Sequence, residues 1–179
     1  MTEIYFLQIR DVKLPTRGTP ESAGIDFYVP EYNEQFLKDL KDKNPILDYL
    51  YADSDRDSDI PILMVLKPGD RVLIPSGIKC AMGSDRALIA HNKSGVASKR
   101  GLDVLANVVD ADYKGEIHIN LVNTGSENVY IEFGEKIIQF IEIPIFISSI
   151  VQISNQENLD KYYRTNTRGS GGFGHTGTK

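Results

Sequence analysis

Short runs of apolar or alternating residues recur along most of the chain, and turn-forming residues separate them. Alternation with a period of two over four to eight residues is typical of β-strands that bury one face. Strands are predicted in the ranges 4–9, 22–29, 62–66, 71–74, 78–82, 87–90, 116–122, 129–133 and 137–147. Many short strands at this spacing, with Gly, Pro, Asn and Ser between them, predict an all-β jelly roll or distorted β-barrel.

Residues 31–60 interrupt this β pattern. Apolar residues there repeat at the spacing of a helix face, with Lys and Asp on the opposite face. They are Phe36, Leu37, Leu40, Ile46, Leu47, Leu50 and Tyr51, with Pro45 suited to a second helix start. We therefore predict a partly helical insertion at 31–60, which either covers the chain's own barrel or docks a partner protein.

A second, short helix is predicted at 94–100. Ser94 lies near its N-cap, and Gly101 follows its end. The apolar pattern stops at residue 153, so we predict a β domain at 1–153 and a flexible Gly-rich C-terminal arm at 154–179. The run R-G-S-G-G-F-G-H-T-G at 168–177 contains too much glycine to hold itself in place.

The stretch 107–120 reads N-V-V-D-A-D-Y-K-G-E-I-H-I-N and is predicted to form a β-hairpin. Its turn carries two carboxylates and an aromatic ring, on Asp110, Asp112 and Tyr113. Such a turn could hold a flat polar ring against its backbone while one acid positions a water. The pattern fits an ordinary acidic hairpin equally well. A different strand, 22–29, is entered through small residues, which allow close backbone approach to a neighbouring chain or a ligand.

The amino-acid composition limits the classes of molecule that the protein is expected to bind. Hydrophobic residues make up 41% and charged residues 25% of the chain, as is usual for a soluble globular domain. A net charge of −5 argues against a nucleic-acid polymer as the main partner but leaves room for a small phosphate ligand. No run reaches the length of a membrane span, and the N-terminus lacks a basic segment followed by an apolar one. We therefore expect no membrane association and an intracellular protein, cytoplasmic or nuclear, for which a viral or phage origin stays open.

The sequence offers no zinc or disulfide framework. Cys80 is the single cysteine, and it is expected to act as a small buried hydrophobe. The three histidines, His91, His118 and His175, have no metal-ligand spacing.

Three features favour phosphate binding. The predicted helix start at Ser94 and Gly95 presents backbone amides beside Lys93. The Gly-rich arm offers further N–H groups, and Gln139 is a polar side chain within an otherwise apolar run. Each feature is weak evidence alone, since a Ser-capped helix is usually only a helix and a Gly-rich arm is usually a linker.

Together and in this order, five segments resemble the five motifs of the trimeric dUTPase family. They are A-G-I-D at 23–26, K-S-G-V-A at 93–97, V-V-D-A-D-Y-K-G-E at 108–116, G-E-K-I-I-Q at 134–139 and R-G-S-G-G-F-G-H-T-G at 168–177. The resemblance implies a jelly-roll subunit of a homotrimer whose active sites are each shared by three chains. It also implies hydrolysis of dUTP to dUMP and pyrophosphate with Mg²⁺, which limits uracil in DNA and supplies dUMP for thymidylate synthesis.

The resemblance also implies roles for single residues. Asp110 would be the catalytic base that activates a water, and Tyr113 would pack under the deoxyribose and exclude a 2′-hydroxyl. Phe173 would stack on the base, Arg168 would grip the γ-phosphate, and Asp26 would contact the metal through water while the phosphates hold it. The other implied substrate-binding residues are Lys93, Ser94, Gly95, Asn107, Val109, Gln139, Gly172, Gly174 and Thr176.

Four residues depart from the usual family pattern. Lys93 stands where Arg is usual, so a point charge replaces a bidentate fork. Asn92 replaces Pro, Asn107 replaces a frequent Gly, and His175 replaces a common Ser. None of these changes removes the implied base, the ring or the metal requirement.

Two rival functions stay open. A dCTP deaminase shares the fold, but it would need a catalytic Glu within the third-motif strand and no Tyr beneath the sugar. A binding module with a dUTPase-like scaffold would use the insertion at 31–60 to dock a partner protein.

Overall fold

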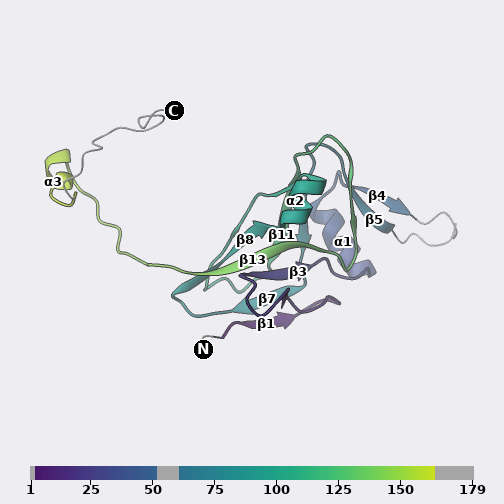
Figure 1. Cartoon of the computed structure of the whole chain (residues 1–179), viewed down its shortest axis with the longest axis horizontal. Coiled ribbons are helices and arrows are strands. Elements are labelled where there is room, and N and C mark those ends of the chain that lie inside the picture. The colour runs from purple at the N-terminus through teal and green to yellow at the C-terminus, as the bar shows by residue number, and fades with distance from the viewer. Residues whose placement is uncertain (1–2, 52–60, 164–179) are drawn as a thin grey trace. The chain divides into compact units, whose positions relative to one another are not determined.

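The computed structural model describes residues 3–51 and 61–163 of the chain (Figure 1). The strands are β1 (Tyr5–Gln8), β2 (Thr16–Arg17), β3 (Gly24–Tyr28), β4 (Asp48–Tyr51), β5 (Pro61–Leu66), β6 (Arg71–Pro75), β7 (Ile78–Ala81), β8 (Arg86–Asn92), β9 (Leu102–Val104), β10 (Val108–Val109), β11 (His118–Asn123), β12 (Val129–Glu132) and β13 (Lys136–Pro144). The helices are α1 (Glu34–Lys43), α2 (Ser94–Arg100) and α3 (Gln156–Asp160). The β-rich class predicted from the alternation is confirmed. Two compact units divide the chain, Met1–Phe146 with all of these strands, and Ile147–Lys179 with α3.

The strands of the first unit form four small sheets. The largest has the order β10-β8-β13-β3-β2, and the others are β1-β7, β6-β11-β9 and β12-β5-β4. Strand β13 lies between β3 and β8 (Figure 1), and this antiparallel register places Gln139 opposite both Asp26 and His91. The largest sheet therefore brings the first, second and fourth candidate motifs together.

Aromatic packing anchors the two strands that carry these polar residues. The Phe27 ring on β3 and the Phe140 ring on β13 have centroids 4.5 Å apart, and Phe6 packs edge-on against Phe27 at 5.7 Å. Phe27 is fully buried and Phe140 is 1% exposed. Burying such side chains stabilises the fold by roughly 1.5–3 kcal/mol each and fixes the register of the strands.

The insertion is helical only in its first half. Asn33 caps α1, since its side-chain oxygen accepts the N–H of Phe36 at 2.8 Å. The apolar face, Phe36, Leu37 and Leu40, is buried in the core. The helical spacing predicted after Pro45 is wrong, because residues 48–51 form β4 and pair with β5. The segment D-Y-L-Y is rich in aromatic β-formers, and the free edge of β5 supplies backbone partners that override the apolar spacing.

The predicted hairpin at 107–120 is also wrong as a pairing of two strands. Val108 and Val109 pair with Ile89 and Leu88 of β8, whereas β11 pairs with β6 and β9. The turn itself exists, since the Tyr113 N–H donates to the Asp110 carbonyl at 3.1 Å. The loop 110–117 therefore connects two different sheets. Alternation identifies a strand, but it does not identify the strand's partner.

The short helix predicted at 94–100 is confirmed as α2. Its N-cap is Lys93, not Ser94, and no side chain caps it. Gly101 ends it in the left-handed conformation, with φ 68°, as a C-terminal glycine typically does. In the predicted arm, residues 156–160 form α3, whose N-cap Asn155 accepts the N–H of Asn158 at 3.0 Å.

Candidate active site

One acid and two lysines form a cluster at the start of the second and fourth candidate motifs. Asp26, on β3, has a side chain that is only 7% exposed. Its carboxylate accepts hydrogen bonds from the Nζ of Lys93 and from the Nζ of Lys136, the latter at 3.1 Å. Burial alone would raise the pKa of Asp26, but the two lysines outweigh it and the pKa is lowered. The cluster therefore holds the Asp26 carboxylate between two lysine ammonium groups.

Gln139 lies beside this cluster. Its Nε2 donates to the Asn92 carbonyl at 2.8 Å, directly before Lys93. A Cβ on Gly24 would approach the Gln139 side chain to 1.9 Å. The close approach predicted at the small-residue entry of this strand is thus made by a side chain of the neighbouring strand β13.

The first turn of α2 is exposed. Ser94 and Gly95 both face solvent, and a Cβ on Gly95 would meet nothing within 4 Å. These two residues follow Lys93 directly, so the predicted phosphate-side residues Lys93, Ser94, Gly95 and Gln139 lie around one end of β8.

A cavity of about 180 Å³ lies beside the middle of β8, where Val108 and Val109 pair with Ile89 and Leu88, and the loop 110–117 lines part of it. Four predicted residues line it, Asn107, Val109, Asp110 and Tyr113. The remaining lining residues are Ala106, Val108, Ile117, His118 and Phe140. His118 and Phe140 were missed by the sequence analysis. The signal for His118 was a polar residue within an alternating strand, and the signal for Phe140 was its place beside Gln139.

The Tyr113 ring is held against the backbone of its own loop. Its hydroxyl donates to the Glu116 carbonyl at 2.9 Å. A Cβ on Gly115 would lie 2.4 Å from the Tyr113 hydroxyl oxygen, so the glycine makes room for the ring. The ring is 42% exposed, which leaves one face available to a ligand.

The Asp110 carboxylate is available for chemistry. Asp110 is exposed, and within residues 3–51 and 61–163 its side chain makes no hydrogen bond or ion pair. Its backbone carbonyl closes the turn with Tyr113, which fixes where the side chain emerges.

Within the described residues, no hydrogen bond or ion pair joins the two groups of predicted residues. Asn107 and Val109 lie beside Ala90 and Leu88 in the middle of β8, whereas Lys93 follows the end of that strand. Arg168, Gly172, Phe173, Gly174 and Thr176 lie outside the described residues.

The described residues contain no group of three or more His, Cys, Asp or Glu side chains that could hold a metal ion. No helix among them is long and apolar enough to cross a membrane. Cys80 is half-buried, and burial raises the pKa of its thiol, as expected for an unreactive cysteine.

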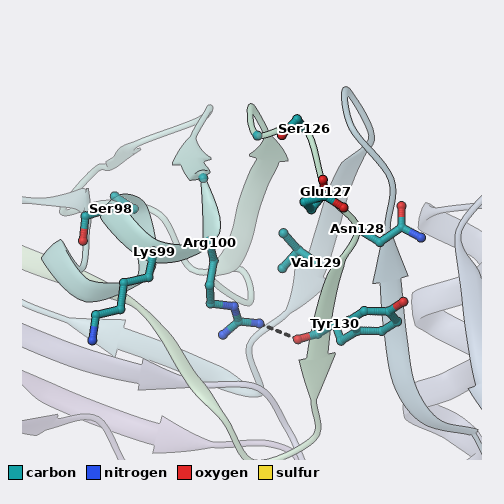
Figure 2. Close-up of a pocket in the computed structure, with 11 residues that line it drawn as sticks. Ser98, Lys99, Arg100, Ser126, Glu127, Asn128, Val129 and Tyr130 are labelled. Carbon is teal, nitrogen blue, oxygen red and sulfur yellow. Dashed lines mark hydrogen bonds between the residues drawn. The ribbon is translucent and has the colours of Figure 1, made fainter.

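A larger hollow of about 480 Å³ lies between the end of α2 and β12 (Figure 2). Arg100 extends across it and donates to the Tyr130 carbonyl, and it also pairs with Glu135. None of the predicted site residues lines this hollow. Because Arg100 is already paired with Glu135 and Tyr130, it is not available to a ligand. The size of a hollow alone therefore does not identify the active site.

Comparisons with known proteins show which family the chain resembles. A dUTPase family model matches residues 59–177. The chain is 34% identical over 168 residues to a deoxyuridine 5'-triphosphate nucleotidohydrolase from Maricaulis maris, covering 93% of this chain and 88% of the relative. It is 38% identical over 128 residues to the protein of the same name from Chlamydia pneumoniae, covering 70% and 84%.

The fold is similar to solved structures. The dUTPase of Staphylococcus bacteriophage 80alpha with dUPNHPP aligns with a TM-score of 0.71 and 20% identity, and 99% of each chain is covered. A mutant of the dUTPase from phage phi11 of S. aureus aligns with a TM-score of 0.63 and 17% identity over 87% of this chain and 99% of that one. That structure is described as revealing the coordination of a structural Mg(II) ion.

Proposed function

Because the chain belongs to the dUTPase family, we propose that it hydrolyses dUTP to dUMP and pyrophosphate, with Asp110 as the base that activates water. In a cell, this reaction would lower the dUTP available for incorporation into DNA and supply dUMP for thymidylate synthesis. The observation that carries the proposal is the exposed Asp110 carboxylate, unpaired within the described residues, which lines a small cavity together with Tyr113.

The reaction needs one proton acceptor and one leaving group. Asp110 accepts a proton from a water, and the water oxygen forms a bond to the α-phosphorus. The bond from that phosphorus to the α,β-bridging oxygen breaks, and pyrophosphate leaves with the electron pair. General-base catalysis of this kind usually contributes roughly 10²–10⁴-fold to the rate.

The cavity accounts for the choice of nucleoside. The Tyr113 ring, fixed by Gly115 and by the Glu116 carbonyl, presents a flat face beneath a deoxyribose. A ribose 2′-hydroxyl would meet that face without a partner, and a polar group buried without a hydrogen bond is costly. The backbone at Asn107 and Val109 can read the edge of uracil, since both residues line the cavity. In the arm, Phe173 would stack on the base with Gly172 and Gly174 giving close approach, while Arg168 and Thr176 would bind phosphate.

The phosphate chain would bind around the other cluster. Lys93 and Gln139 supply charge and an amide, and Ser94 and Gly95 supply donors at the exposed start of α2. Lys136 holds Asp26 when Lys93 turns to a phosphate.

The residues fit a magnesium ion that arrives with the substrate. The buried Asp26 is a single carboxylate, and Mg²⁺ is usually bound by one or two carboxylates, water and substrate phosphates. Asp26 would contact it through water, and bound Mg²⁺ would supply charge neutralisation and orientation of the triphosphate.

A homotrimer would bring the two clusters together. The cavity residues lie beside the middle of β8 and the Lys93 cluster lies at its end, and no hydrogen bond or ion pair joins them in the described residues, so a second copy can supply one of the two groups. Leu105 and Val108 next to the cavity are 44% and 59% exposed in the single chain, as expected of a surface that a partner copy covers.

The first test is pyrophosphate release from dUTP, UTP, dCTP and dTTP, with Mg²⁺ and with a chelator. We expect dUTP to be turned over far more efficiently than UTP, dCTP or dTTP, and only with Mg²⁺. Asp110→Asn should lower kcat by roughly 10²–10⁴-fold without loss of dUTP binding. Its matched control is Asp112→Asn, the second exposed acid of the same loop, which should keep most of the rate. Full activity of the Asp110→Asn protein would refute the proposed mechanism.

The second test addresses the shared site. Chains carrying Asp110→Asn and chains carrying Lys93→Met are refolded together and assayed at a dUTP concentration well below KM, where each variant alone is strongly impaired. Partial recovery of activity is expected, since some sites then receive an intact residue from each chain. No recovery in mixed trimers would mean that one chain supplies both groups. A molar mass of a single chain in light scattering would exclude the trimer.

The rival deaminase reading is tested by ammonia release from dCTP. Glu116 is the acid of the third motif that lies just before β11, but Arg10 and the Gly77 N–H already bind its carboxylate. The arrangement therefore favours a diphosphatase, and no ammonia is expected.

The insertion favours a covering role over partner docking. Phe36, Leu37, Leu40 and Leu47 are at most 9% exposed, so these apolar side chains are already used in the chain's own core. Ile46, Leu50 and Tyr51 are 83%, 44% and 46% exposed, and they are the apolar residues of the insertion that remain open to a partner protein.

A further inference from the structure

Arg10 forms a partly buried two-point ion pair with Glu116, the last residue of the third candidate motif. The Arg10 Nε lies 2.7 Å from Oε1 of Glu116, and its Nη2 lies 2.9 Å from Oε2. The side chains are 15% and 12% exposed. Glu116 also accepts the Gly77 N–H at 2.7 Å. A forked pair with an additional backbone donor allows Glu116 very little movement.

The insertion holds the other side of the Arg10 guanidinium. Asp39 on α1 accepts from Nη2 of Arg10 at 2.7 Å, and the guanidinium carbon lies 5.9 Å from the centroid of the Phe36 ring. The Gln35 amide donates to the Asp39 carboxylate at 2.8 Å and steadies it. Helix α1 therefore fixes the orientation of Arg10 through a charge and an aromatic face.

The backbone carbonyl of Glu116 links the Arg10 and Asp39 contacts to the cavity. Its carbonyl accepts the Tyr113 hydroxyl at 2.9 Å and the Nδ1 of His118 at 2.8 Å. Both rings line the cavity. Because a carbonyl oxygen only accepts, the Nδ1 of His118 carries the hydrogen. Arg10 holds the side chain of Glu116, and the backbone carbonyl of Glu116 is thus the acceptor that orients the Tyr113 and His118 rings.

We propose that Arg10 is a positioning residue for sugar selection, through which Asp39 of the insertion fixes Glu116 and so the Tyr113 ring. The insertion then sets how strongly the enzyme prefers dUTP over UTP. This inference rests on the proposed function, in which Tyr113 lies beneath the deoxyribose.

The physical reason lies in how few contacts hold Tyr113. The ring is 42% exposed, and its orientation depends on the hydroxyl bond and on the space above Gly115. If the Glu116 carbonyl can move, the ring can tilt, and a ribose gains room for its 2′-hydroxyl. The expected consequence is a relative gain for UTP, not a uniform loss of activity.

The test measures the ratio of kcat/KM for dUTP to kcat/KM for UTP in the full-length protein. Arg10→Met and Asp39→Asn should each lower this ratio by about three- to tenfold, which is the effect of one lost hydrogen bond. Tyr113→Phe, which removes only the hydroxyl, should lower it similarly. Arg10→Lys should recover part of the ratio, because it keeps the charge without the fork.

The matched control is Asp48→Asn. Asp48 is another carboxylate of the insertion, on β4, and it pairs with Lys67 at 2.6 Å without contact to the loop 110–117. This variant should keep the wild-type ratio. A merely structural role for Arg10 would lower both kcat/KM values together and leave the ratio unchanged.

The outcomes separate this inference from the proposed function. An unchanged ratio in Tyr113→Ala would overturn the role given to Tyr113, and the inference with it. A collapsed ratio in Tyr113→Ala with an unchanged ratio in Arg10→Met and Asp39→Asn would overturn the inference alone. If Arg10→Met does not fold, Asp39→Asn decides, since it preserves the volume of a side chain that is 27% exposed.

Discussion

A Cβ atom on Gly24 would lie 1.9 Å from the Oε1 atom of Gln139. The two residues are on neighbouring antiparallel strands but are not register partners, since Gly24 lies opposite Ile141 and Gln139 lies opposite Asp26. The Gln139 side chain therefore extends along β3 into the space that a side chain at position 24 would fill. The same amide donates to the Asn92 carbonyl. A glycine of the first motif thus positions an amide of the fourth motif beside the second.

Gly24→Ala should reduce activity more than stability. The clash is mainly with the flexible end of Gln139, which can turn away, although the Gln139 Cβ at 3.2 Å is also close. We expect kcat/KM for dUTP to fall about tenfold or more, with a change in unfolding free energy near 1 kcal/mol. Gly18→Ala is the control, because its Cβ would make an ordinary 3.5 Å contact with Ser22. A loss of stability large enough to explain the loss of activity would contradict this prediction.

The sequence was informative where local pattern and long-range structure agree. Alternation identified strands such as β11 and β12, since each buries one face and needs only period two to do so. It misjudged 48–51, where pairing with the edge of β5 outweighed helical spacing. It also joined Val108–Val109 to β11, because a two-residue strand carries no information about its partner.

The sequence predicted residues of the candidate site only where they lie in a recognisable motif. Gln139 was conspicuous as a polar residue in an apolar run, but its contacts depend on β13 lying between β3 and β8. Arg10 gave no signal, because its partner Glu116 is 106 positions away in the chain. Only the packing of β1, α1 and the loop 110–117 brings these two charges together.

Phe36→Ala tests whether the insertion is part of the fold. Phe36 is fully buried and packs edge-on against Phe133, with ring centroids 6.1 Å apart. We expect a loss of about 3–5 kcal/mol in the free energy of unfolding, measured by urea denaturation. Ile46→Ala, in the same insertion but at a side chain 83% exposed, should change it by less than about 0.5 kcal/mol. Equal effects of the two substitutions would mean that the insertion is not integrated into the core.

Lys93→Arg tests the phosphate role of the cluster. Arginine would present a planar fork to a phosphate and could still pair with Asp26. We expect KM for dUTP to fall by roughly two- to fivefold with kcat little changed. Lys93→Met should raise KM by about tenfold or more, while Asp26 remains paired with Lys136. The control is Lys99→Arg, at an exposed position of the same helix. If Lys93→Met binds dUTP normally, Lys93 serves only to neutralise Asp26.

His118 should make stability depend on pH between about pH 7 and pH 5. Burial lowers its pKa below the ordinary 6.5, and nearby Lys43 lowers it further. Its Nε2 is buried without a partner within the described residues, so protonation would place an unsatisfied N–H there. Below pH 6.5 the unfolded chain binds a proton more readily than the folded one. The contribution of His118 to the free energy of unfolding is therefore fully present above about pH 6.5 and declines as the pH falls.

This contribution can be isolated from that of the carboxylates. The pKa values of Asp26 and Glu116 are lowered from 3.8 and 4.5, so these groups reduce stability only at more acidic pH. Denaturation midpoints measured from about pH 7.5 to pH 5 should fall for the wild type and stay nearly flat for His118→Gln. The control His91→Gln removes an exposed histidine from β8 and should keep the wild-type dependence. A wild-type slope in His118→Gln would mean that another group titrates in this window, and the cavity histidine would then have no part in it.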